Sequence, residues 1–109
     1  MQDDLSTEVL DLGAARRGEL TESYLTSMGA MLQIALQRLF AGAGGSMKVT
    51  GSRKEVESLK RTLSGEKRYM DSYISHGLDD ARTLGDRHKL MGSVQSFEQE
   101  TGLRWPFKN

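Results

Sequence analysis

The clearest pattern along the chain is a run of apolar residues at helical spacing between residues 20 and 41. At about 100° per residue, their side chains fall within an arc of roughly 140°. They are Tyr24, Leu25, Met28, Met31, Leu32, Ala35, Leu36 and Leu39. The opposite side carries hydroxyl and carboxamide side chains and is uncharged apart from its two ends. The spacing predicts an amphipathic helix over residues 20 to 41.

A second helical pattern begins after residue 51. Residues 52–55 read Ser-Arg-Lys-Glu, which fits a capping box, because the serine hydroxyl and the glutamate carboxylate can each accept from the other's backbone amide. An apolar stripe about 100° wide follows, with Glu66 as its one polar member. We expect a helix over residues 53 to 76, ended by Gly77 in a left-handed conformation with Leu78 packed against the last turn.

The third helical pattern lies near the C-terminus. Leu90, Val94 and Phe97 recur at helical spacing after a polar joint, and Gly102 closes the segment. This pattern predicts a helix over residues 86 to 101. The tail Trp105-Pro106-Phe107 is then expected to be extended, because the residue before a proline avoids the helical region. Tails this apolar are usually tied down, so we expect it to close the core, although a recognition peptide is the alternative.

The first eighteen residues give a weaker pattern. Leu5, Val9 and Leu12 form one short helical stripe that then meets Gly13, so we expect a short or frayed helix followed by a joint. Residues 47 to 50 alternate apolar and polar side chains, which allows a short strand. The expected fold class is all-α: a small helical bundle or hairpin with an amphipathic N-terminal helix.

A glycine-rich run at residues 41 to 46 divides the chain. Glycine's backbone freedom ends the preceding helix and makes this run the obvious linker. Before it there are three basic and six acidic residues, and after it there are twelve and nine. We therefore expect two parts: residues 1–46, an amphipathic helical segment with its linker, and residues 47–109, a compact helical unit closed by the tail.

Composition narrows the classes of function. Fifteen basic residues balance fifteen acidic ones, so the whole-molecule charge does not steer the chain toward nucleic acid or anionic membranes. The absence of cysteine excludes disulfides, thiolate metal sites and a cysteine nucleophile. The acidic start, Met1 to Asp4, lacks the features of an export signal, and no apolar run is long enough to span a bilayer. We expect a cytoplasmic protein.

Few residues suggest chemistry. His76, Asp79 and Asp80 could bind a metal or exchange protons, but these types also suit the end of one helix and the start of the next. The glycine-rich run follows a helix rather than a strand and lacks the lysine of a phosphate loop. His88 reads as part of a solvated helical turn. We expect no enzyme activity, no metal and no cofactor.

A basic stripe is the first candidate surface. Lys54, Arg61 and Arg68 recur every seven residues opposite the apolar stripe, and seven basic against three acidic residues lie between positions 48 and 68. Phosphate binding is one interpretation. A merely solvated face is the preferred one, because Glu57 precedes Arg61 by four residues, which stabilises an exposed helix, and no aromatic residue interleaves the stripe.

The methionine-rich stripe of residues 20 to 41 is the second candidate surface. Methionine adapts to varied partners, so we expect a non-catalytic interaction or assembly module that self-associates into a homo-oligomer or binds a partner helix. The expected partner-binding residues are Met28, Met31, Leu32, Ala35, Leu36 and Leu39. Packing of the same stripe inside its own chain is about equally favoured. The alternative function is a nucleic-acid or anionic-surface accessory that uses the basic stripe.

Overall fold

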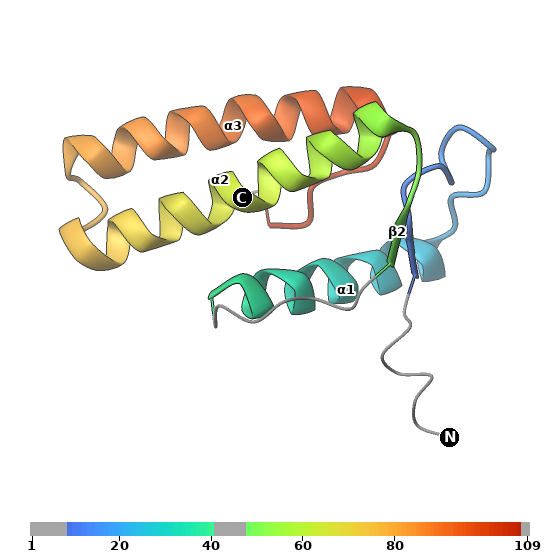
Figure 1. Cartoon of the computed structure of the whole chain (residues 1–109), viewed down its shortest axis with the longest axis horizontal. Helices are drawn as coiled ribbons and strands as arrows, with labels where there is room; N and C mark the ends of the chain where they lie inside the picture. Colours follow the sequence, from blue (N-terminus) through green and yellow to red (C-terminus); the bar gives the residue numbers. More distant parts are fainter. Residues whose placement is uncertain (1–8, 41–47, 108–109) are drawn as a thin grey trace, which may run out of the picture.

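Within the described residues, the fold consists of three helices and two very short strands. The computed structural model describes residues 9–40 and 48–107. The order of elements is β1 (Val9–Asp11), α1 (Glu22–Phe40), β2 (Lys48–Thr50), α2 (Arg53–His76) and α3 (Ala81–Thr101). In Figure 1, α2 and α3 form an antiparallel hairpin, α1 lies along one side of it, and the C-terminal segment runs between them. The predicted all-α class is confirmed, with the small parallel sheet added.

The predicted start of α2 is confirmed, but its predicted end is wrong in detail. Ser52 Oγ accepts from the Glu55 amide at 3.2 Å, and Glu55 Oε1 accepts from the Ser52 amide at 2.7 Å, which completes the capping box. The helix ends at His76 as expected. Gly77, however, combines a positive φ of 90° with a ψ of 161°, which is not the expected left-handed helical cap, so the chain does not fold back over the last turn. Leu78 therefore projects into solvent and is 60% exposed.

Helix α3 begins five residues earlier than the pattern predicted. Asp80 caps it, because its carboxylate accepts from the Arg82 amide at 2.8 Å. The apolar period starts only near Leu90, which is why the sequence pattern missed the first turns. The predicted end is confirmed: Gly102 is left-handed at φ 74°, and its N–H donates to the Glu98 carbonyl at 2.9 Å.

The segment before α1 contains a strand, so the helix expected there is wrong for the described residues 9–18. β1 pairs in parallel with β2, with Leu10 opposite Val49. Leu10 and Leu12 are both fully buried, whereas Val9 is 46% exposed. Two residues apart is the period of one strand face, so Leu10 and Leu12 decide the local structure. The short strand expected at 47–50 is confirmed over Lys48–Thr50; Leu5 and Met47 lie outside the described residues.

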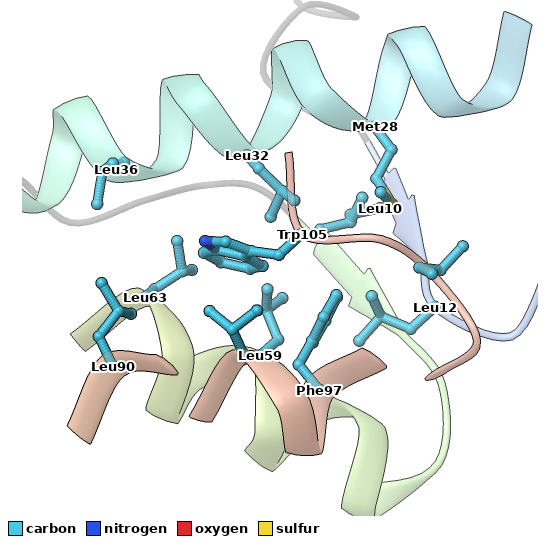
Figure 2. Close-up of a cluster of buried hydrophobic side chains, with 12 residues drawn as sticks. Leu10, Leu12, Met28, Leu32, Leu36, Leu59, Leu63, Leu90, Phe97 and Trp105 are labelled. Carbon is cyan, nitrogen blue, oxygen red and sulfur yellow. The ribbon is translucent and has the colours of Figure 1, made fainter. Parts of the chain in front are cut away.

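One hydrophobic core of described residues joins these elements. Figure 2 shows Trp105 at its centre, with α1 on one side and the hairpin on the other. The buried members are Leu10, Leu12, Met28, Leu32, Leu36, Leu59, Leu63, Leu90, Val94, Phe97, Leu103 and Trp105. The indole packs edge-on against Phe97 at 5.1 Å and Phe107 at 5.6 Å between ring centroids. The expectation that the tail closes the core is thereby confirmed, and residues from both predicted parts share that core.

The hairpin packs closely along its contact line. A Cβ built on Gly65 would lie 3.4 Å from Leu90 Cδ1, so glycine allows α3 to approach α2 at this position. One turn earlier, Thr62 Oγ1 lies 2.8 Å from the Ser58 carbonyl and 3.2 Å from the Ser93 carbonyl of α3. The shared hydroxyl ties the two helices together. These contacts fix the side of α2 that packs against α3, and they thereby determine which side of α2 faces solvent.

Candidate functional site

Three pairs of adjacent basic residues lie along α2 at intervals of seven. They are Arg53-Lys54, Lys60-Arg61 and Lys67-Arg68. Seven residues make almost two full helical turns, so each pair is displaced from the previous one by only about 20°. The pairs therefore form two parallel rows on one side of α2, which we call the basic face. One row consists of Lys54, Arg61 and Arg68. Its two ends, Lys54 and Arg68, are separated by about 21 Å along the helix axis.

The basic face is turned to solvent. Five of its six side chains are exposed and Lys67 is half-buried, while Leu59 and Leu63 on the opposite side of α2 belong to the core. The three sequence-predicted phosphate-binding residues, Lys54, Arg61 and Arg68, occupy one row. The fold thus brings them together on one accessible surface.

Ion pairing distinguishes the two rows. Glu57 accepts from Arg53 Nε at 3.4 Å, and Asp71 accepts from Lys67 Nζ at 2.8 Å. Both carboxylates therefore pair with one row, and the Glu57–Arg61 pair expected from the sequence is absent. Within the described ranges, Lys54, Arg61 and Arg68 form no ion pair or hydrogen bond with a side chain. This row is left with uncompensated positive charge.

A polar groove continues the basic face toward the end of α2. Its volume is about 430 Å³, and it is lined by Ser64, Lys67, Arg68, Asp71, Ser72, Ser75 and His76. The Ser72 hydroxyl donates to Asp86 of α3, which holds the rim of the groove to the second helix of the hairpin. Hydroxyl, ammonium and guanidinium groups are the usual donors to phosphate oxygens. The groove therefore adds hydrogen-bond donors to the charge of the face.

The predicted partner-binding residues of α1 lie against the chain's own core. Met28, Leu32 and Leu36 are buried there, and Met31 and Ala35 are half-buried against the same cluster. The side chain of Leu39 lies outside the described residues. Of the two interpretations that the sequence left open, this arrangement is the intramolecular one. A role of these residues in binding a partner stays a prediction, and it would require α1 to leave the hairpin.

The candidate residues around the α2–α3 turn have structural contacts. Asp80 caps α3 and pairs with Arg82 Nε at 3.0 Å, and these hydrogen bonds lower the pKa of the Asp80 carboxyl to about 2. His76 and Asp79 are exposed beside it, and His88 is exposed on α3. Over residues 9–40 and 48–107, no three histidine or carboxylate side chains come close enough together to hold a metal ion.

Two buried carboxylates were not singled out as sites by the sequence. Glu55 is bound by Arg16, whose Nε lies 2.8 Å from Oε2 and whose Nη2 lies 3.0 Å from Oε1; these hydrogen bonds lower the pKa of Glu55. Glu66 is only 7% exposed, and its Oε1 accepts from Trp105 Nε1 at 2.9 Å. Burial raises the pKa of Glu66. Both partners are 39 residues away in sequence, so helical periodicity could not reveal these contacts.

Comparison of the chain with protein-family models, with curated proteins and with solved structures finds no match. Among the described helices, none combines the length and the sustained apolar character needed to cross a membrane. The basic face of α2 is the candidate binding surface, because Lys54, Arg61 and Arg68 have no ion-pair partners among the described residues.

Proposed function

We propose that this chain is a non-catalytic binding protein that contacts the phosphate backbone of a nucleic acid through the basic face of α2. The observation that supports the proposal is the row of Lys54, Arg61 and Arg68, which is exposed and lacks carboxylate partners among the described residues. Cations that are not paired within the protein gain most from external phosphates, because binding releases the counterions condensed on the nucleic acid.

The dimensions of the face fit such a partner. A duplex carries one phosphate charge per about 1.7 Å of axis, so a duplex segment as long as the roughly 21 Å between Lys54 and Arg68 carries about twelve phosphates on its two strands. No aromatic side chain is available on the face for stacking on bases, since Tyr69 and Tyr73 are half-buried and pack against each other at 5.7 Å. Affinity is therefore expected to depend on phosphate charge and salt rather than on base sequence.

A lipid surface is a poorer match for this face. Helices that lie on anionic membranes insert apolar side chains beside their basic residues. On α2, Ile74 is the large aliphatic side chain that is strongly exposed, and it lies beyond the last basic pair. The basic rows thus lack an adjoining apolar edge, which favours a nucleic-acid backbone over a membrane.

Self-association through residues 20–41 costs more free energy in this fold than binding through the basic face, because the apolar side chains of α1 must first leave the core. Exposing a buried aliphatic side chain costs about 1.5–3 kcal/mol, so freeing Met28, Leu32 and Leu36 would cost roughly 5–9 kcal/mol. That approaches the whole stability of a typical domain, about 5–15 kcal/mol. A partner would have to replace all of this burial, whereas the basic face is accessible without any rearrangement.

The proposal is tested by fluorescence anisotropy with a labelled DNA duplex and a labelled RNA hairpin. Changing Lys54, Arg61 and Arg68 together to Gln should weaken binding about 10²-fold at roughly 0.1 M salt, because three phosphate contacts are lost. The matched control changes three exposed cations elsewhere, Arg87, Lys89 and Arg104, to Gln and thus removes the same charge.

The control variant should keep most of the affinity. Equal weakening in both variants would show that net charge, rather than this face, carries the binding. Failure of the native chain to bind either nucleic acid at low salt would overturn the proposal. So would binding to phosphatidylserine vesicles in place of nucleic acid.

A further inference from the structure

A pocket lies between α1, α2 and the C-terminal segment, away from the basic face. Its volume is about 320 Å³, and its lining residues are Gln33, Leu36, Gln37, Glu66, Met70 and Phe107. Pockets for small molecules are typically about 300–1,000 Å³, mostly apolar, with a few polar groups that fix orientation. This pocket has a volume in that range and both kinds of group, with three apolar side chains, two carboxamides and one carboxyl.

Glu66 gives the pocket its chemical character. Its Oε1 accepts from Trp105 Nε1, and a carboxylate can accept several further hydrogen bonds. In the described part of the chain, no lysine, arginine or histidine forms an ion pair with it. It is also the one titratable side chain among the lining residues. A carboxylate buried without a cation is unfavourable, so a cation brought by a ligand would stabilise the ionised form of Glu66.

We propose that this pocket binds a small organic cation that carries a primary ammonium on an apolar group. The ammonium has three N–H donors, which match the Glu66 carboxylate and the carboxamide oxygens of Gln33 and Gln37. The apolar group would pack against the remaining walls, Leu36, Met70 and Phe107. An anion of the same size is excluded by repulsion from Glu66, and a neutral molecule leaves the carboxylate uncompensated.

Three probes of nearly equal size separate these cases: phenethylamine as its ammonium, 2-phenylethanol and phenylacetate. Binding is measured on the full chain by titration calorimetry and by the emission of Trp105, the single tryptophan, which touches both Glu66 and Phe107. We expect the ammonium to bind at least about tenfold more tightly than the alcohol, and phenylacetate to show no binding. Because the bound cation requires ionised Glu66, ammonium affinity should rise with pH from about 4 to 7, while alcohol affinity stays constant.

Three variants test whether the preference for the ammonium over the alcohol arises in this pocket. Glu66→Gln keeps an acceptor for Trp105 Nε1 but removes the charge, so ammonium and alcohol should then bind equally. Met70→Trp fills the pocket and should abolish binding of both while keeping Glu66. Glu100→Gln, which removes an exposed carboxylate of α3 outside both proposed sites, is the matched control and should not change the binding of either probe.

Circular dichroism checks that each variant is folded. If Glu66→Gln does not fold, Met70→Trp still tests whether the probes bind in this pocket. The proposal is wrong if phenethylammonium produces neither heat nor a change in Trp105 emission, if the three probes bind alike, or if Glu66→Gln retains the preference for the ammonium. Nucleic-acid binding through the basic face is independent of all these outcomes.

Discussion

The hydrogen bond between Trp105 and Glu66 allows a quantitative test of the core. Trp105→Phe keeps an aromatic ring between Phe97 and the neighbouring helices but removes the Nε1–H donor. Glu66 is 7% exposed, so its carboxyl has little contact with bulk water from which to recover that hydrogen bond. Leaving a buried polar group unsatisfied costs about 1–3 kcal/mol. Truncation to Ala would add roughly 3–5 kcal/mol for the lost ring, which approaches the stability of the whole chain, so Phe is the informative change.

A double-mutant cycle isolates the hydrogen bond from the change in shape. Trp105→Phe, Glu66→Leu and the double variant are compared with the native chain by urea unfolding followed by circular dichroism, which does not need the tryptophan signal. Because the double variant leaves no polar group orphaned, it should be about 1–3 kcal/mol more stable than the two single changes sum to. A coupling energy below about 0.5 kcal/mol would show that Glu66 is satisfied without Trp105 and would refute the reasoning.

Three further outcomes are expected from local features of the fold. Burial raises the pKa of Glu66 in the folded state, so the native chain loses stability as pH rises above the ordinary pKa of a glutamate, about 4.3. Glu66→Gln should therefore gain stability relative to the native chain as pH rises above that value, and a difference in urea unfolding that does not change with pH would contradict this. Thr83 Oγ1 is buried without a partner among the described residues, so Thr83→Val should raise the free energy of unfolding by about 1 kcal/mol. Gly102→Ala should lower it by about 1–2 kcal/mol, because φ is 74° and the new Cβ would lie 2.9 Å from Ala15 Cβ; an unchanged melting midpoint would count against the left-handed cap.

Local sequence rules predicted the features that are themselves local. The capping box of α2 and the left-handed Gly102 depend on residues within one or two turns, and both are confirmed. β1 depends on pairing with a strand 39 positions later, so the helical spacing of Val9 and Leu12 was misleading while the buried alternation of Leu10 and Leu12 was decisive. Sequence patterns identify an amphipathic segment more readily than its partner.

The same limit applies to the candidate sites. The apolar stripe of α1 showed that one face must be covered, but helical periodicity does not say whether the cover comes from the same chain. The position of Glu66 in an apolar stripe was visible, yet its contact with Trp105 is made by the tertiary fold. On the basic face, Glu57 has Arg53 four residues before it and Arg61 four residues after it, and only the structure distinguishes the two, with the pair formed to Arg53.

The most direct test of the proposed function is the salt dependence of nucleic-acid binding. The slope of log Kobs against log salt concentration is negative, and its magnitude decreases by about 0.9 for each duplex phosphate contact that is removed. The variant in which Lys54, Arg61 and Arg68 are all Gln should therefore show a slope about 2.7 smaller in magnitude than the native chain, while the control with Arg87, Lys89 and Arg104 changed keeps the native slope. Identical slopes for the native chain and the first variant would contradict phosphate binding by the basic face of α2.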